Sequence, residues 1–296
     1  MAVEWLAQVI LPWVLAGVML ALGMSLTGED FRRIWKHPRR VVLGLAMQML
    51  ALPLLAWVLV LLLPLSPMAA AGLLLVSLVP GGATSNMFSY LVQGDLALSV
   101  SLTAIAALLV PFTLPLVMGW NFQLLGLAAQ GFALSYWQTV GQLLLVTLVP
   151  ALAGMLLRRM SREATISDWL PRVRLFTGVA MVGIVVTLFL AYHNRLPALI
   201  SIETLAVLML CMLAMLLGHR VSRRLGLPLD SVRAITVEVG VQNAGVAMMV
   251  AFAIMQLPQL GLVPLLYGLL MNVPVFLWVF FCLWRDRQMV TIAERS

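Results

Sequence analysis

The feature that most constrains the fold of this chain is the length of its segments without charged side chains. No Asp, Glu, Lys, Arg or His occurs between Glu4 and Glu29, between Arg40 and Asp95, or between Asp95 and Arg158. A membrane-spanning helix needs roughly 20 consecutive, mostly apolar residues, so these gaps hold one, two, and two or three spans. The chain has 296 residues, of which 63% are hydrophobic and 10% charged, and this composition excludes a soluble domain.

The rest of the chain continues this pattern and leaves the number of spans at nine or ten. One apolar segment covers 175–192, and another covers 197–218 with Glu203 near its start. The segment 234–284 holds two more spans and has Glu238 as its only charged residue. The uncertainty comes from the stretch before Arg158, which has room for two or three helices.

Positive charge decides between the two counts. Lys and Arg accumulate in short cytoplasmic loops, and the basic residues form four clusters, with only Arg195 elsewhere. All clusters lie on one side only if an even number of spans separates them, which requires two spans before Arg158. We therefore predict nine helices, with the N-terminus outside and the C-terminus in the cytoplasm. The clusters are Arg32, Arg33, Lys36, Arg39 and Arg40; Arg158, Arg159, Arg162, Arg172 and Arg174; Arg220, Arg223, Arg224 and Arg233; and Arg285, Arg287 and Arg295.

The net charge of +7 follows from this topology, so no nucleic acid is expected as a partner. Cys211 and Cys282 are isolated in apolar segments, which argues against a disulfide framework or a metal cluster. His37, His193 and His219 are predicted at helix ends. The N-terminus has no basic region followed by a cleavage site, so no removable signal peptide is expected. The polar, aromatic stretch 120–138 is predicted to be an outer loop or an interfacial helix.

A short internal similarity indicates a duplicated membrane domain within 1–296. The sequence LPLSP at 63–67 and the sequence LPLDS at 227–231 both precede a helix rich in small and polar residues. Pairing the first four helices with the last four offsets the copies by five helices, an odd number, so the second copy is inverted, as in many secondary transporters. The helices are predicted at 5–26, 40–62, 68–92, 95–119, 135–158, 174–192, 198–218, 231–255 and 259–283; the repeats cover about 5–119 and 174–283, joined by the helix 135–158.

The third helix contains Pro80-Gly81-Gly82 in mid-span. Proline removes a backbone donor and glycine weakens a helix, so a broken helix with free backbone groups is predicted. Such backbone is tolerated inside a membrane only where it lines a cavity or binds something. Because polar residues follow the break, including Ser85 and Asn86, we favour a binding site over a packed proline kink.

The eighth helix carries Glu238, an ionisable residue deep in an apolar segment, which marks a functional site by default. Glu238 and Gln242 are four residues apart and share one helix face. No Lys or Arg of the sequence is placed to neutralise the carboxylate, so a bound cation or a proton is expected; a protonated Glu bonded to a neighbouring helix is the alternative. One carboxylate with neutral oxygens suits a monovalent cation such as Na⁺. The neutral oxygens come from Gln48, Ser85, Asn86, Ser99, Thr103 and Gln242.

These motifs resemble the bile acid:sodium symporter family, in a bacterial form with nine helices. The resemblance rests on the sequences PGG at 80–82, SN at 85–86, ALSV at 97–100 and EVGVQN at 238–243, with KHP at 36–38 and Gln48 in support. It implies an all-α membrane protein in the inner membrane of a bacterium, with an inverted repeat, a panel and a core domain, and two broken helices (the third and the eighth) that cross at mid-membrane.

The resemblance also implies two sodium ions and an organic anion, bile-acid-like or pantothenate-like, as substrates in a lipid bilayer, without an obligate protein partner. Sodium site one comprises Ser85, Asn86, Ser99, Thr103 and Glu238; site two comprises Gln48, Glu238, Val239, Val241 and Gln242; and the substrate site comprises Thr84, Asn243 and Asn272. Two departures concern the cavity and not the ion ligands. Ala83 and Thr84 are exchanged relative to many members, and Met271 stands where some members have His.

The predicted function is sodium-coupled symport of an organic anion by alternating access, and not an enzymatic activity. A proton-coupled or uncoupled carrier, in which Glu238 titrates, is the alternative. An intramembrane aspartyl protease would need two embedded Asp residues, but Asp95 and Asp230 lie at predicted helix ends, and no mid-membrane base is present for a serine protease. A receptor or scaffold would not need the polar crossing. The particular anion, the ion stoichiometry, the oligomeric state and the direction of transport are left open.

Overall fold

The computed structural model describes residues 2–28, 36–194 and 201–293, and the regular structure within these ranges is helical. Eight helices of the described residues are long and apolar enough to cross a membrane, and a ninth span is counted if one bent helix pair is taken as a single span. The predicted count of nine agrees with this upper number. The basic residues Arg32, Arg33, Arg195 and Arg295 lie outside the described residues.

The described residues of the first half of the chain form four apolar helical segments, several of them interrupted. Their elements are α1 (Ala2–Trp5), η1 (Leu6–Ile10) and α2 (Leu11–Ser25); α4 (Pro38–Ala46), η2 (Met47–Ala51) and α5 (Leu52–Leu62); α6 (Pro67–Leu78) and α7 (Ala83–Leu91); and α8 (Leu96–Leu124), followed by the short η3 (Ala128–Gln130).

The part of the second half that the structure describes contains five such segments. Their elements are α9 (Tyr136–Leu143), η4 (Leu144–Leu148) and α10 (Val149–Met160); α11 (Glu163–Tyr192); α12 (Ile202–Arg224); α13 (Leu229–Gly240), α14 (Ala244–Met248) and η5 (Met249–Ile254); and α15 (Pro258–Leu270) with α16 (Asn272–Ala293).

Three of the interruptions are π-helical turns that end just before a proline. The elements η1, η2 and η4 are followed by Pro12, Pro53 and Pro150, each the second residue of the next α-helix. Proline lacks an N–H, and its ring clashes with the carbonyl four residues earlier. The wider π turn absorbs that clash, so the helix continues across the proline instead of ending there.

Several helices extend beyond the bounds predicted from hydropathy. The helix predicted at 174–192 begins at Glu163, which places Arg172 and Arg174 within α11 and not in a loop. The helix predicted at 95–119 continues to Leu124 and takes up the start of the stretch 120–138, which was predicted as a loop or interfacial helix. Hydropathy finds only the apolar part of a helix, whereas backbone hydrogen bonds continue it into polar surroundings.

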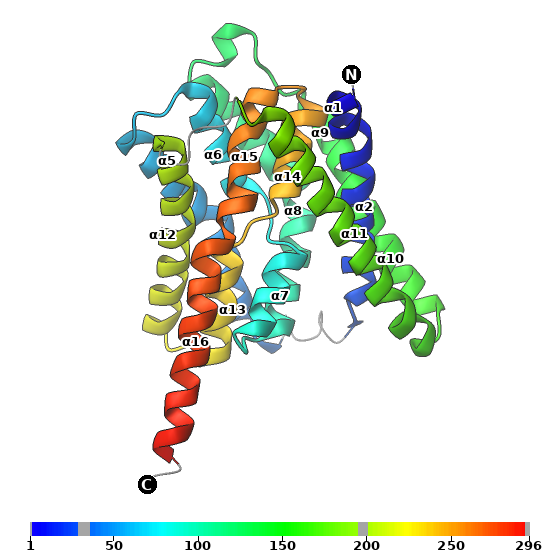
Figure 1. Ribbon diagram of the computed structural model, residues 1–296, viewed down its shortest axis with the longest axis vertical. Coiled ribbons are helices and arrows are strands. Elements are labelled where there is room, and N and C mark those ends of the chain that lie inside the picture. The colour runs from blue at the N-terminus through cyan, green and yellow to red at the C-terminus, as the bar shows by residue number, and fades with distance from the viewer. Residues whose placement is uncertain (1, 29–35, 195–200, 294–296) are drawn as a thin grey trace.

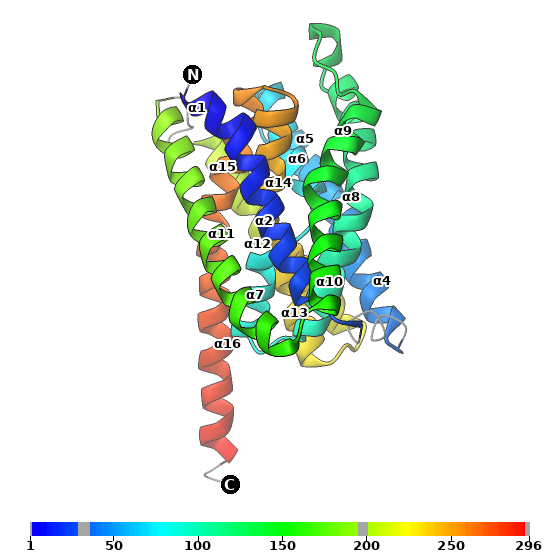
Figure 2. The ribbon, with the colours of Figure 1, turned by 90° about the vertical axis from the view of Figure 1, so that its right-hand side faces the viewer.

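Helices α2, α10 and α11 form one packed group (Figures 1 and 2). Glycines permit the close approach of α2 and α10, as is common between membrane helices. A Cβ on Gly154 would lie 2.8 Å from the backbone nitrogen of Met24, and a Cβ on Gly23 would lie 2.9 Å from the Cα of Ala151. A second extensive contact joins α12 to α13, where a Cβ on Gly218 would lie 3.3 Å from a carbonyl of α13.

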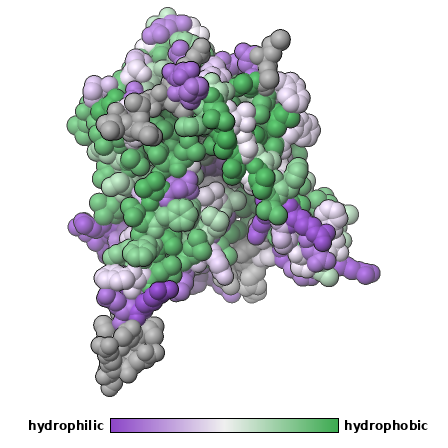
Figure 3. Space-filling model, viewed as in Figure 1, coloured by the Kyte–Doolittle hydropathy of each residue, from purple (hydrophilic) through white to green (hydrophobic). Residues whose placement is uncertain are grey.

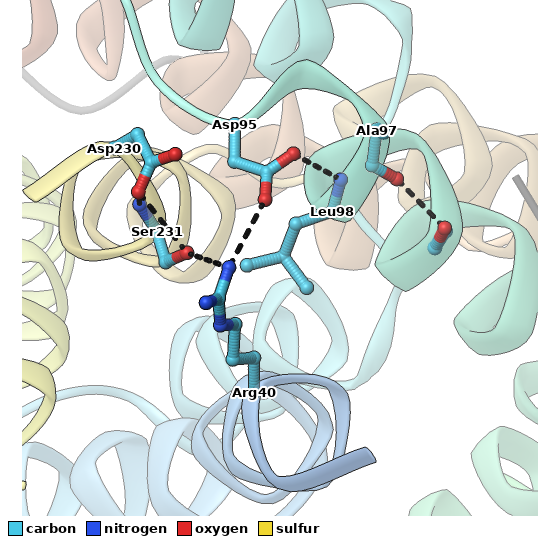
Figure 4. A network of polar contacts seen from close by, with 7 residues as sticks. Arg40, Asp95, Ala97, Leu98, Asp230 and Ser231 are labelled. Atoms are coloured by element: carbon cyan, nitrogen blue, oxygen red, sulfur yellow. Dashed lines mark hydrogen bonds and ion pairs between the residues drawn. The ribbon is translucent and has the colours of Figure 1, made fainter. Parts of the chain in front are cut away.

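A polar network ties together the starts of α4, α8 and α13 (Figure 4). Asp95 caps α8 by accepting a hydrogen bond from the N–H of Leu98 at 3.0 Å, and its own N–H donates to the carbonyl of Asp230 at 3.0 Å. Arg40 donates to the hydroxyl of Ser231 at 3.2 Å and lies 3.8 Å from the Asp95 carboxylate. These three helices therefore begin at the same end of the molecule.

The surface has the pattern of a protein surrounded by lipid. In Figure 3 hydrophobic residues cover the middle of the visible face, and hydrophilic residues gather towards its two ends. Many large apolar side chains of the described residues are widely exposed, such as Leu54, Leu61 and Phe280 at 66%, 78% and 72%. Apolar groups on that scale are stable only in a non-aqueous environment.

Candidate functional site

The first part of the candidate site is the break between α6 and α7. The two helices meet at an angle of 64°, and Pro80, Gly81 and Gly82 lie between them. Ser85 closes the start of α7, because its hydroxyl accepts from the N–H of Gly82 at 3.1 Å and donates to the carbonyl of Gly82 at 2.8 Å. The serine thereby satisfies backbone groups that the interrupted helix leaves open.

The second part is the break between α13 and α14. Val241 is extended, with φ −109° and ψ 106°, and Asn243 caps α14 by accepting from the N–H of Val246 at 3.2 Å. The backbone N–H of Asn243 donates to the carbonyl of Pro80 at 2.9 Å. A direct hydrogen bond therefore joins the two breaks, although about 160 residues of sequence separate them.

Glu238 lies beside this contact and is completely buried. The Thr103 hydroxyl donates to Oε1 of Glu238 at 2.6 Å, and the Ser99 hydroxyl donates to Oε2 at 2.7 Å. Ser99 also lies 2.9 Å from Oδ1 of Asn86, but its single proton serves only one acceptor at a time. Ser89 completes the cluster by donating to the Ser99 oxygen at 3.1 Å.

Gly81 permits this arrangement by its lack of a side chain. A Cβ on Gly81 would overlap Oε1 of Glu238 and would lie 3.0 Å from the Ser85 hydroxyl. Ser85 and Glu238 belong to different helices, and both side chains lie against Gly81. The backbone of the first break is therefore in direct contact with the Glu238 carboxylate. The structure thus brings together all five residues of the first predicted ion site, Ser85, Asn86, Ser99, Thr103 and Glu238.

The second predicted set contains two buried glutamines with unsatisfied amide atoms. Gln48, on η2, is 2% exposed, and neither its Nε2 nor its Oε1 has a hydrogen-bond partner among the described residues. Gln242 is 1% exposed, and its Nε2 donates to the carbonyl of Val239 at 2.8 Å. Its Oε1, like the amide atoms of Gln48, has no hydrogen-bond partner within the described ranges. Leaving such a group unsatisfied costs about 1–3 kcal/mol, so both amides have the character of ligand groups.

Gln48 also lies beside the first break. It lines a cavity of about 160 Å³ together with Val79 and Pro80, between η2, the end of α6 and α8. The element η2 also contacts α13, which carries Glu238. The predicted ligands of site two therefore come from η2, from α13, which contacts it, and from the break that follows α13; they are Gln48, Glu238, Val239, Val241 and Gln242.

The three predicted substrate residues differ in their surroundings. Thr84 is half-buried in the first turn of α7, whereas Ala83 is exposed. Asn243 is half-buried, and its Nδ2 would lie 3.3 Å from a Cβ on Gly82, so it lies against the first break. Asn272, the first residue of α16, bonds back to the end of α15, where its Nδ2 donates to the carbonyls of Gly268 and Leu269 at 3.0 Å and 3.1 Å.

Three polar residues of the site were missed by the sequence prediction. Ser89 lies four residues after Ser85, and this helical spacing could have indicated it. Tyr267 and Cys211 both donate to the carbonyl of Gly240, at 2.8 Å and 3.2 Å. Their sequence surroundings are apolar, so only the packing of α12 against α13 and of α15 against α14 places them there.

A bundle of apolar helices around a buried carboxylate, with hydroxyl and amide groups at two helix interruptions, defines a polytopic membrane protein of the transporter class. The chain belongs to the Sodium Bile acid symporter family, whose model matches residues 12–201. The resemblance of the sequence motifs to this family is thereby confirmed.

Curated relatives extend this similarity over most of the chain. It is 31% identical to the probable sodium/metabolite cotransporter BASS1 of the Arabidopsis thaliana chloroplast, over 81% of this chain and 59% of that protein. It is also 31% identical to the uncharacterized sodium-dependent transporter YocS of Bacillus subtilis (strain 168), over 80% of this chain and 71% of that protein. A sodium-dependent organic anion transporter of Bos taurus is 29% identical over 46% of this chain and 36% of that protein. All three names describe transporters and not enzymes, as the sequence predicted.

Proposed function

We propose that this protein is a sodium-coupled symporter of an organic anion. The observation that carries the proposal is Glu238, a fully buried carboxylate to which the neutral hydroxyls of Ser99 and Thr103 donate hydrogen bonds. A buried charge is stable only when an opposite charge or a proton compensates it. A cotransported sodium ion supplies that charge and leaves together with the substrate.

The donor atoms at the site fit sodium in two positions that share Glu238. Site one uses Ser85, Asn86, Ser99 and Thr103 with the carboxylate, and site two uses Gln48, Gln242 and the carbonyls of Val239 and Val241. One carboxylate among neutral oxygens suits a monovalent cation, because calcium and magnesium usually require more carboxylates. The unsatisfied Oε1 atoms of Gln48 and Gln242 would gain a partner when the ion binds.

The substrate site lies where α7 and α14 begin, beside Thr84 and Asn243, with Asn272 on the adjoining α16. Helix N-termini carry partial positive charge, and two of them here begin next to each other, since Asn243 is bonded to Pro80. This arrangement favours an anionic group such as a carboxylate. The names of relatives that transport metabolites or organic anions support the same substrate class, of which bile-acid-like and pantothenate-like acids are candidates.

The transport cycle would move a core against a panel. The packed group α2, α10 and α11 is the candidate panel, and the helices that carry the site are the candidate core. The two inverted repeats, about 5–119 and 174–283, would contribute helices to both domains, with the two broken helices crossing in the core. Positive residues gather at the end where α10 and α12 finish, which supports a cytoplasmic position for that end and an outer position for the N-terminus. The sodium-dependent relative from Bacillus supports a bacterial inner membrane.

Uptake by proteoliposomes tests the proposal. Vesicles containing the purified protein are supplied with labelled organic acids, with an inward gradient of either sodium or potassium chloride. We expect sodium-dependent uptake by the wild type and its loss in Glu238→Ala and Gln242→Ala. The exposed residues Glu163 and Gln123 provide matched controls as Glu163→Ala and Gln123→Ala. Unchanged sodium-dependent uptake by Glu238→Ala and Gln242→Ala would rule out these ion sites.

A proton-coupled carrier is the second candidate, and the same hydroxyl contacts favour it, because Ser99 and Thr103 would bond equally well to a protonated Glu238. The distinguishing measurement is uptake driven by an inward pH gradient in sodium-free vesicles. Proton coupling predicts transport under that condition, whereas sodium coupling predicts none.

A further inference from the structure

Gly240 is the last residue of α13, and its carbonyl is held by two side chains from other helices. The Tyr267 hydroxyl on α15 donates to it at 2.8 Å, and the Cys211 thiol on α12 donates to it at 3.2 Å. Both side chains are completely buried. A carbonyl oxygen has two lone pairs, so these two donors occupy its full accepting capacity.

If the Gly240 carbonyl were free, it could accept the helical hydrogen bond that would join α13 to α14. In a continuous α-helix the carbonyl of Gly240 accepts from the N–H of the residue four positions later, Ala244. The N–H of Ala244 instead donates to the carbonyl of Gln242 at 2.9 Å. Likewise the next N–H back, that of Asn243, goes to Pro80 on the other break. The Gly240 carbonyl and the N–H groups of Asn243 and Ala244, which a continuous helix would use, therefore all have other partners.

The same contacts set the direction of the neighbouring carbonyls. Val241 is extended, and carbonyls on either side of an extended residue point in roughly opposite directions. Holding the Gly240 carbonyl towards α12 and α15 therefore turns the Val241 carbonyl towards the opposite side of the chain. The element that carries Gln48, η2, is a separate neighbour of α13.

We infer that Tyr267 and Cys211 are positioning residues that keep α13 and α14 apart and so hold the carbonyl of Val241 open to the second sodium ion. This inference rests on the proposed sodium coupling. Neither side chain touches the ion itself. Their role is to prevent this backbone ligand from being lost to an ordinary helical hydrogen bond.

The test compares variants that remove or retain the donor atoms. Tyr267→Phe removes only the hydroxyl, Cys211→Ala removes the thiol, and Cys211→Ser retains a donor at the same position. Tyr90, which is 70% exposed on α7, and Cys282, buried on α16, provide matched controls as Tyr90→Phe and Cys282→Ala. Each protein is assayed for the sodium concentration that gives half-maximal uptake, for the Michaelis constant of the anion at saturating sodium, and for melting temperature in sodium and in potassium.

We expect Tyr267→Phe to raise the half-saturating sodium concentration about three- to tenfold, the equivalent of one lost hydrogen bond, and the double variant with Cys211→Ala to raise it further. Uptake should recover at high sodium, the Michaelis constant of the anion should stay within about twofold, and Cys211→Ser should remain close to wild type. A merely structural contact would lower the melting temperature equally in both salts without changing the half-saturating concentration, and that result would overturn the inference.

The two proposals fail in different ways. If the wild type shows neither sodium-dependent uptake nor stabilisation by sodium, the proposed function itself is wrong. If the wild type depends on sodium and both Tyr267→Phe and the double variant retain its half-saturating concentration, only the positioning role is wrong. A variant that does not fold is replaced by Cys211→Ala alone, for which the same comparison with Cys211→Ser applies.

Discussion

Replacing Glu238 with Gln should keep the fold and abolish stabilisation by sodium. Glutamine has the same heavy-atom framework as glutamate, so its amide oxygen accepts from one of the two hydroxyls and its NH₂ donates to the oxygen of the other. Those hydroxyls, on Thr103 and Ser99, lie 2.6 Å and 2.7 Å from the carboxylate oxygens. Both contacts are therefore retained, and only the negative charge that the cation needs is lost.

The expected magnitude follows from ligand linkage. Sodium at 100 times its dissociation constant stabilises the folded protein by about 2.7 kcal/mol for one site. For a chain of this size each kcal/mol shifts the melting temperature by about 2–4 °C, so the wild type should gain roughly 5–10 °C. In potassium the variant should be at least as stable as the wild type, because a neutral amide replaces a buried carboxylate of Glu238 that has no ion to compensate it.

The assay is thermal unfolding of the detergent-solubilised protein in matched sodium and potassium chloride, without substrate. Glu163→Gln serves as the control, because Glu163 is 78% exposed in its side chain and pairs with Arg158 at the surface. The control should keep the full response to sodium. A sodium-induced shift in Glu238→Gln equal to that of the wild type would refute the assignment of the carboxylate to the ion sites.

Three further predictions address separate contacts. Gly81→Ala should reduce uptake about tenfold or more, because overpacking against the buried carboxylate costs roughly 1–3 kcal/mol. The control Gly119→Ala, where a Cβ meets nothing within 4 Å, should transport normally. A normal uptake rate in both variants would contradict the close packing at Gly81. Gln48→Leu should raise the unfolding free energy in sodium-free buffer by about 1–3 kcal/mol, since it removes amide atoms without partners among the described residues. It should also lower the Hill coefficient for sodium in uptake. A destabilised variant with an unchanged Hill coefficient would show that Gln48 contributes only to the stability of the fold. Arg233→Ala should destabilise the protein by about 3 kcal/mol in a thermal melt, because the 5% exposed Arg233 donates to the carbonyl of Val92 and pairs with Asp286. An unchanged melting temperature would show that this ion pair contributes nothing to stability.

Much of the fold could be predicted because membrane helices are defined locally. Runs of apolar residues between charges located the spans, and the proline and glycines at 80–82 indicated the interruption that separates α6 from α7. The ends of helices were predicted less well. Helix α11 begins at Glu163 and α12 continues to Arg224, since polar residues remain helical beyond the lipid and hydropathy does not record them.

The sequence by itself determined that this chain is a helical membrane protein with a carboxylate inside a membrane-spanning segment. It also predicted which polar residues surround that carboxylate. Only the tertiary structure decided which of them meet. The hydrogen bond from Asn243 to Pro80, the fit of Gly81 against Glu238 and the hold of Tyr267 on Gly240 all join segments far apart in sequence. Local patterns carry no information about such distances, because they are set by the packing of whole helices against one another.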